Sequence, residues 1–192
     1  MIDEETVRRR DADATKARIL SVAQVVFSEL GYSHAGIREI ATRAGTSSTL
    51  VLRYYGSKAG LFRAALEASM PVAAAIAGKR ETFGADLARA LLDPENAIRP
   101  PLMIALASGD PEAAAIAASV FEEKSVRGLA NWLGGEEARA RALQIAMIST
   151  GLVFYLRQLP IDPFSDIELD GVTAWFEKVV QDLVDSAGHG AG

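Results

Sequence analysis

Cysteine is absent from the 192 residues of the chain, and histidine occurs only twice, as His34 and His189. The lack of cysteine excludes disulfide bonds, thiolate metal sites and thiol nucleophiles. Two isolated histidines form no cluster of the kind that metal sites use. We therefore expect no metal and no cofactor.

Long apolar runs are absent as well. The longest uncharged stretch, residues 142–156, has 15 residues, fewer than the roughly 18 or more that a membrane-spanning helix needs. The N-terminal residues MIDEETVRRR are acidic and then basic, without the apolar centre of a signal peptide. These absences predict a soluble protein of the cytoplasm with no membrane partner.

Charge is unevenly distributed along the chain, whose net formal charge is −5. Residues 8–63 hold ten Arg or Lys against four Asp or Glu, whereas residues 64–192 hold ten basic against eighteen acidic residues. A basic N-terminal part would turn one face of the protein towards nucleic-acid phosphates, whereas phosphates would repel the acidic remainder of the chain. This uneven distribution of charge favours a nucleic-acid-binding N-terminal part. The alternative explanation is a chance distribution of solvated surface charges.

The stretch from Ile37 to Phe62 has the pattern of two short helices joined by a turn. Apolar residues recur at helical spacing from Ile37, the pattern breaks at Gly45, and the hydroxyl residues Thr46 and Ser47 can cap the next helix. That second helix ends near Gly56. Helix, glycine-bearing turn and helix form the layout of a helix-turn-helix DNA reader.

A first helix precedes this motif. Its apolar residues recur at steps of three and four over residues 19–30, and Gly31 ends the pattern. We expect Asp11 or Asp13 to cap this helix, and residues 1–12 to form a flexible arm.

Beyond Phe62 the sequence is helical throughout, without a strand pattern. Prolines and glycines divide it into expected helices that begin near residues 58, 83, 100, 111, 136 and 166 or 170, with Pro71 ending or kinking the first of them. We therefore predict an all-α fold of about nine helices. It comprises a helix-turn-helix domain over 13–57, a larger helical domain over 58–187, and a flexible tail over 188–192.

Residues 31–62 closely resemble the TetR family of bacterial one-component transcriptional regulators. The resemblance is carried by GY at 31–32, IREIA at 37–41, AGTS at 44–47, LVLRYY at 50–55 and GSKxxLF at 56–62. It covers about the first quarter to third of the chain. It implies a three-helix DNA-binding domain, a larger helical domain for effector binding and dimerisation, and usually repression.

The same resemblance implies which residues contact DNA, and their chemistry agrees with it. Small hydroxyl residues at the front of a short helix can approach base edges closely, and an arginine fork matches guanine. A lysine at a helix N-terminus adds its charge to the exposed amides that attract phosphate. The implied contacts are Arg38, Thr46, Ser47, Ser48, Thr49, Leu52, Arg53, Tyr54 and Lys58. Many family members have tyrosine in place of Leu52, which could instead touch a thymine methyl group.

The last two helices suggest a subunit interface. Residues 142–156 are apolar all round, and the final helix carries a broad apolar stripe. A homodimer with a four-helix interface would cover both, whereas burial inside one subunit is the alternative. The expected interface residues are Ala146, Ser149, Val153, Val172, Trp175 and Val179.

A ligand cavity between the helices of the larger domain is harder to recognise. Methionines and aromatic residues at helical spacing are more often plain core than cavity lining. The candidates are Met70, Met103, Phe121, Trp132, Met147 and Tyr155, and the expected ligand is apolar or amphipathic.

The sequence thus predicts a DNA-binding transcriptional regulator that is a homodimeric repressor. It would leave a near-palindromic operator when a small ligand binds, and would lie at the bacterial nucleoid while bound to double-stranded DNA. The alternative is a dimeric DNA-binding regulator without a small-molecule effector. We do not expect an enzyme, because the acidic pairs Glu122-Glu123 and Glu136-Glu137 are adjacent in sequence and diverge around a helix.

Overall fold

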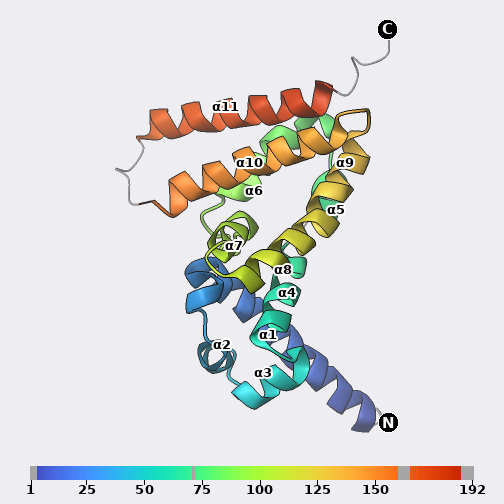
Figure 1. Ribbon diagram of the computed structural model, residues 1–192, viewed down its shortest axis with the longest axis vertical. Coiled ribbons are helices and arrows are strands. Elements are labelled where there is room, and N and C mark those ends of the chain that lie inside the picture. Colours follow the sequence, from blue (N-terminus) through green and yellow to red (C-terminus); the bar gives the residue numbers. More distant parts are fainter. Residues whose placement is uncertain (1–3, 71, 160–164, 187–192) are drawn as a thin grey trace.

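The computed structural model describes residues 4–70, 72–159 and 165–186, and within these ranges every regular element is helical (Figure 1). The predicted all-α fold is confirmed. The elements are α1 (Glu4–His34), α2 (Ile37–Arg43), α3 (Ser48–Tyr55), α4 (Lys58–Ser69), α5 (Val72–Ile76), η1 (Arg80–Thr82), α6 (Phe83–Leu92), α7 (Pro100–Ala107), α8 (Pro111–Phe121), η2 (Glu122–Val126), α9 (Arg127–Leu133), α10 (Ala138–Arg157) and α11 (Asp166–Asp185).

The expected count of about nine helices agrees with this set once two features are considered. The π-helical turn η2 joins α8 to α9, so the three form the single helix expected from residue 111 to about 133. The segment α5 has only five residues. Proline in the first turn begins both α7 and α8, as the sequence predicted.

The N-terminal helices form one end of the molecule, and α10 and α11 form the other (Figure 1). The long helix α8–η2–α9 and the helix α4 lie between the two ends. Across the described ranges, no helix has the length and apolarity that crossing a membrane requires.

The first core surrounds an aromatic cluster near the end of α1. The Phe62 ring meets the edges of Phe27 and Tyr32 at centroid distances of 5.0 and 5.2 Å. The predicted stripe of α1 is buried in this core, together with Met103 of α7 and Val120 of α8. Because the core continues into α7 and α8, the helix-turn-helix packs directly on the body of the protein.

The second core joins α6, α9, α10 and α11. Gly84 allows the close approach of α6 to α11, because a Cβ atom at this position would lie 2.3 Å from the carbonyl oxygen of Glu177. The Gly84 N–H donates to the side chain of Gln181 at 3.1 Å. Arg80 donates hydrogen bonds to the carbonyl oxygens of Leu133 and Val184, and so joins the C-terminal ends of α9 and α11.

The N-terminus differs from the expectation. Residues 4–12 continue α1 as a helix instead of forming a flexible arm, because no proline or glycine interrupts the sequence before Gly31. Asp11 and Asp13 therefore do not cap the helix. Gly31 interrupts it at φ 69°, as predicted, and one further turn follows. Pro71 and the expected tail over 188–192 lie outside the described residues.

Candidate nucleic-acid interface and ligand cavity

The helix α3 turns one face to the core and the other to solvent. The predicted cap is confirmed, because the Ser47 hydroxyl accepts a hydrogen bond from the Leu50 N–H at 3.2 Å. Val51 is fully buried, whereas Arg53 is exposed and Leu52 is 42% exposed. This face presents a guanidinium and an apolar side chain side by side, the two chemistries that read guanine and thymine.

The remaining predicted DNA contacts surround this helix. Ser47 and Thr49 are exposed at its front, and Arg38 is exposed on α2. The other predicted contacts are half-buried, namely Thr46, Ser48, Tyr54 and Lys58. The structure thus places hydroxyl and cationic groups around α3, the kinds of group that bond to base edges and phosphates.

Lys58 also has contacts within the protein. Its Nζ atom lies 4.5 Å from the centroid of the Tyr32 ring and donates a hydrogen bond to the Ser33 carbonyl oxygen at 3.4 Å. An ammonium group has three donors, so one can face the protein while another faces a phosphate. Ser57 caps α4 by accepting from the Gly60 N–H at 3.0 Å, which places Lys58 at a capped helix start.

Three residues that the sequence analysis did not assign to the site fix the orientation of α3. A Cβ atom on Gly60 would lie 2.1 Å from the Tyr55 carbonyl oxygen, so only glycine lets α4 approach the end of α3 this closely. The Tyr55 hydroxyl donates to the Lys16 carbonyl oxygen at 2.8 Å, and burial raises the pKa of Tyr55. Arg18 donates to the Ala44 carbonyl oxygen at 2.9 Å. Glycine at position 60 is visible in the sequence, but the carbonyl it faces is not.

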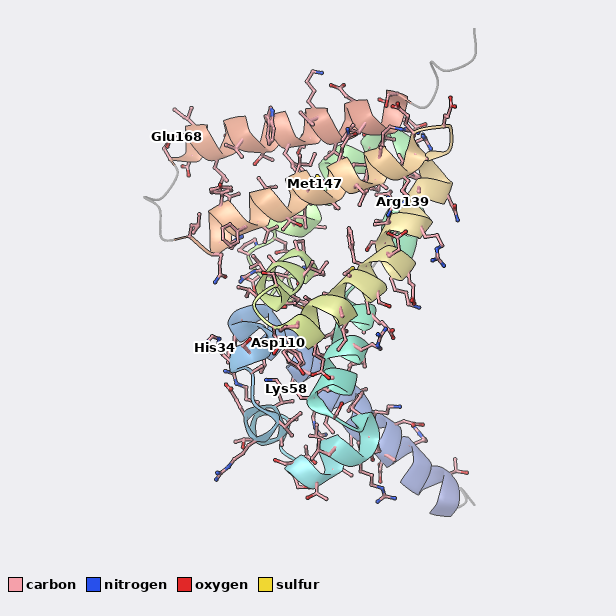
Figure 2. The ribbon with its side chains drawn as sticks, in the orientation of Figure 1. His34, Lys58, Asp110, Arg139, Met147 and Glu168 are labelled. Carbon is pink, nitrogen blue, oxygen red and sulfur yellow. The ribbon has the colours of Figure 1, made fainter. Side chains whose placement is uncertain are left out.

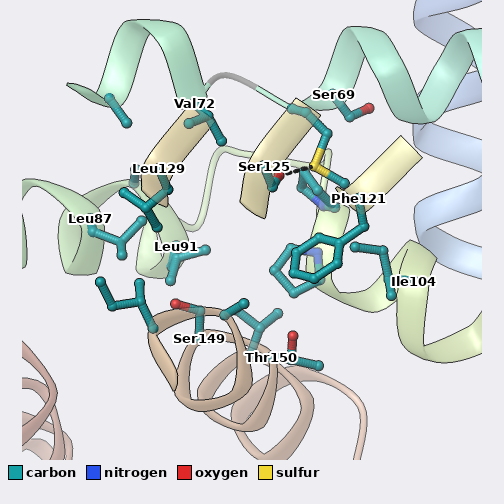
Figure 3. Close-up of a pocket in the computed structure, with 18 of the residues that line it drawn as sticks. Ser69, Val72, Leu87, Leu91, Ile104, Phe121, Ser125, Leu129, Ser149 and Thr150 are labelled. Atoms are coloured by element: carbon teal, nitrogen blue, oxygen red, sulfur yellow. Dashed lines mark hydrogen bonds between the residues drawn. The ribbon is translucent and has the colours of Figure 1, made fainter. Parts of the chain in front are cut away.

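A cavity of about 550 Å³ lies in the larger helical part, between the C-terminal end of α4 and the helices α6, α7, η2, α9 and α10 (Figure 3). Its lining is mostly apolar. Of the residues predicted to line a pocket, Met70 and Phe121 are in its wall. The volume falls within the range of small-molecule sites.

The other four predicted pocket residues lie elsewhere. Met103 is fully buried in the first core. The Trp132 ring packs behind the wall, 4.9 Å from the Phe83 ring and 4.7 Å from the Arg80 guanidinium. Met147, labelled in Figure 2, is 67% exposed, and Tyr155 is 58% exposed. Met147 and Tyr155 lie outside the cavity because α10 turns small and branched side chains, such as Ala146 and Val153, towards it.

Three of the residues expected at a subunit interface line this cavity inside one chain. They are Ala146, Ser149 and Val153, and the last two are buried. Ser149 and Val153 therefore face the interior of the subunit, because the inward stripe of α10 consists of small and branched residues. On α11, Trp175 is 54% exposed, and Val172 and Val179 are half-buried.

The aromatic ring of Tyr32 connects the start of α4 to the start of α8. Its hydroxyl donates to the Glu112 carboxylate at 2.8 Å. Burial, then the hydrogen bond to Glu112 and the charges of Glu112 and Asp110, raise the pKa of Tyr32 to about 12. Lys58 and Asp110, both labelled in Figure 2, therefore flank one tyrosine at this junction.

A second connection lies in the wall of the cavity. Gln24 of α1 donates to the Ser69 hydroxyl at 2.9 Å, and Ser69 donates to the Ala65 carbonyl oxygen at 2.7 Å. Both Gln24 and Ser69 line the cavity. A molecule in the cavity would therefore touch the side chains that join α1 to the end of α4.

The two carboxylates of the acidic pair Glu122-Glu123 have separate partners. Glu122 forms an ion pair with Arg139 at 2.9 Å, and Glu123 accepts from the Ser119 hydroxyl. Within the part of the chain that the structure describes, no group of three or more His, Asp or Glu residues could hold a metal ion.

Two family models match the chain. One, described as "Bacterial regulatory proteins, tetR family", matches residues 19–65. The other, described as "Tetracyclin repressor-like, C-terminal domain", matches residues 81–184, more than half of the chain.

Similar proteins include two curated relatives and a solved structure. The HTH-type transcriptional repressor SCO4008 of Streptomyces coelicolor is 43% identical over 61 residues, 32% of this chain and 32% of that protein. The HTH-type transcriptional repressor NicS of Pseudomonas putida is 36% identical over 93 residues, 48% of this chain and 41% of that protein. The matched stretches thus span less than half the length of either relative. A crystal structure of a TetR-family regulator from Streptomyces coelicolor is 29% identical, with a TM-score of 0.51 over 88% of this chain and 94% of that one.

Proposed function

Because the chain belongs to the tetR family of bacterial regulatory proteins, we propose that it is a homodimeric transcriptional repressor released from DNA by a small ligand. The observation that carries this proposal is the presence, in one chain, of an exposed reading helix and a cavity of about 550 Å³. The cavity favours a ligand-released regulator over one without an effector. Both curated relatives bear the name of HTH-type transcriptional repressors, which supports repression.

In this proposal α3 lies in the major groove of double-stranded DNA. Arg53 donates to a guanine and Leu52 touches a thymine methyl group, while Thr46, Ser47, Ser48 and Thr49 approach base edges and phosphates at the front of the helix. Arg38, Tyr54 and Lys58 contact the phosphate backbone. The protein acts in the bacterial cytoplasm, at the nucleoid when bound to DNA, and has no enzymatic role.

The outer faces of α10 and α11 are the proposed dimer interface. Met147, Tyr155 and Trp175 are exposed there, and methionine and aromatic residues are enriched in the cores of interfaces. The proposed interface keeps three of the residues expected from the sequence, namely Trp175 and the neighbouring Val172 and Val179. A two-fold dimer would place its two α3 helices about one turn of DNA apart, ~34–36 Å, on a near-palindromic site.

In this proposal, release follows from the connection that α8 makes between the cavity and the DNA-binding end of the molecule. Phe121, at the end of α8, is in the cavity wall, and Glu112, near its start, holds Tyr32. A ligand that displaces Phe121 shifts α8 and, through Tyr32, the start of α4. A small tilt in each subunit spoils the spacing of the two reading helices. Such coupling is typically about 1–3 kcal/mol and must be reciprocal.

The test is a binding measurement with the purified full chain and a DNA duplex that it selects from a random pool. Sedimentation should find two chains on each site. Compounds that raise the melting temperature of the free protein are then added. We expect one of them to weaken DNA binding, and DNA to weaken binding of that compound by the same factor. If compounds fill the cavity without changing DNA affinity, the alternative holds, namely a DNA-binding regulator that has no small-molecule effector.

A further inference from the structure

The hydroxyl of Ser149 is buried in the wall of the cavity without a hydrogen-bond partner. The residue is 7% exposed, and its Oγ atom contacts no donor or acceptor among the described residues. Figure 3 shows the side chain extending from α10 towards the cavity, with its oxygen in the space that apolar side chains surround. Buried hydroxyl groups are nearly always paired, so this one points to a function.

The hydroxyl does not use the partner that its own helix offers. A serine or threonine in a helix can donate to the carbonyl oxygen one turn earlier. Ser69 does so to Ala65 at 2.7 Å, and Thr173 to Leu169 at 2.7 Å. Ser149 makes no such bond, and its donor and acceptor are both free to meet a molecule in the cavity.

The buried polar side chains of the wall other than Ser149 are already paired. Gln24 and Ser69 bond to each other, and Ser125 donates to the Met70 sulfur at 3.0 Å. The Asp86 carboxylate accepts from Thr82 and Arg89, each at 2.7 Å, and these bonds lower its pKa. Ser149 is therefore the buried group on which a ligand can gain a hydrogen bond without breaking one.

The rest of the wall restricts the ligand further. Apolar side chains make up most of the lining, among them Val72, Leu87, Leu91, Ile104, Phe121 and Leu129 (Figure 3). An ionised group among these apolar side chains would lose its hydration, and they offer it no counter-charge. Of the charged residues in the lining, Asp86 is exposed and paired with Arg89, and Arg99 is half-buried.

We propose that the cavity takes an uncharged molecule with an apolar body and a hydroxyl or carbonyl group that bonds to Ser149. This inference deepens the proposed function, because it names the chemical class of the effector and the residue that selects it. The hydrogen bond to Ser149 makes a ligand with a polar group bind more tightly than the corresponding hydrocarbon. The apolar wall makes the corresponding acid bind more weakly than both.

The test uses three probes with the same body, which are biphenyl, 4-phenylphenol and biphenyl-4-carboxylate. Equilibrium dialysis against the full chain measures their affinities through the absorbance of each probe. We expect 4-phenylphenol to bind about tenfold more tightly than biphenyl, the ratio that one hydrogen bond confers, and the carboxylate to bind most weakly. In Ser149→Ala the preference for the phenol should fall to about twofold or less, with biphenyl binding unchanged.

Ser125→Ala is the matched control, because Ser125 also lines the cavity but is paired with Met70. It should keep the preference for the phenol. The proposal would be overturned if the parent bound 4-phenylphenol and biphenyl equally, or if the preference for the phenol survived in Ser149→Ala. It would also be overturned if none of the three probes bound, or if the carboxylate bound most tightly. DNA binding without probes is measured separately. If the parent does not bind DNA but still prefers 4-phenylphenol to biphenyl, only the proposed repressor function is refuted.

Discussion

The Tyr32 hydroxyl donates a 2.8 Å hydrogen bond to the Glu112 carboxylate, a residue 80 positions later in the chain. The tyrosine follows the break in α1 at Gly31, and the glutamate lies in the first turn of α8. The same ring lies under the Lys58 ammonium group at the start of α4. This contact therefore joins the reading end of the molecule to the helix whose other end reaches the cavity.

Removing the Tyr32 hydroxyl should reduce the effect of ligand on DNA affinity, while the affinities of the two separate sites change little. In Tyr32→Phe the ring remains over Phe62 while the bond to Glu112 is lost, at a cost of about 0.5–1.5 kcal/mol in the free energy of unfolding. We expect near-parent affinity for DNA without ligand and a smaller weakening of DNA binding by ligand, both measured by fluorescence anisotropy. Glu29→Gln, which breaks an exposed ion pair with Arg43, is the control and should release normally.

The raised pKa of Tyr32 gives a pH dependence of defined sign. Its folded value of about 12 lies above the ordinary value of 10. The contribution of Tyr32 to stability is therefore complete below about pH 10 and is lost as the pH rises towards 12. Tyrosinate absorbance should show a group titrating near 12 in the parent that is missing in Tyr32→Phe. Glu112→Gln should lower this pKa, because it removes a negative charge; an unchanged value would contradict the assignment.

Two glycines should respond oppositely to the same substitution. Gly84→Ala would drive a methyl group against the Glu177 carbonyl oxygen, and forcing α6 from α11 should cost about 1–3 kcal/mol. Gly171 has no atom within 4 Å of its would-be Cβ, so Gly171→Ala should stabilise α11 by about 0.5–1 kcal/mol. Urea denaturation measures both changes. Equal effects would show that α6 and α11 do not pack this closely.

Two arginine substitutions distinguish the subunit interface from the interior. Trp175→Arg places a charge on the exposed face of α11 and should yield a folded monomer, seen as a halved mass by light scattering with helical circular dichroism retained. Val153→Arg puts the charge into the buried wall of the cavity and should destabilise the subunit itself. A parent that is monomeric at micromolar concentration would refute the proposed dimer.

The sequence was most informative where local chemistry determines the structure. The Ser47 cap and the buried stripe of α1 follow from hydrogen-bonding capacity and helical periodicity. Periodicity could not identify the cavity side of α10, because that helix is apolar on most of its surface. Ser149 and Val153 were therefore placed at a subunit interface, and Met147 and Tyr155 in the pocket.

Long-range contacts had no local signal. The hydrogen bond from Tyr32 to Glu112 and the approach of Gly60 to the Tyr55 carbonyl depend on how helices pack. The extension of α1 through residues 4–12 was also missed, because a run of charged residues suggested a solvated arm although nothing in it breaks a helix.

The central claim is that α3 reads a DNA sequence, and sequencing of DNA selected from a random pool tests it most directly. The parent should enrich one near-palindromic motif. Arg53→Ala should lose preference at one symmetric pair of positions, at a cost of about 1–3 kcal/mol, whereas Lys58→Ala should keep the motif, bind all sequences more weakly and lower the salt slope by roughly one. Absence of an enriched motif, or an unchanged motif and affinity in Arg53→Ala, would contradict the account.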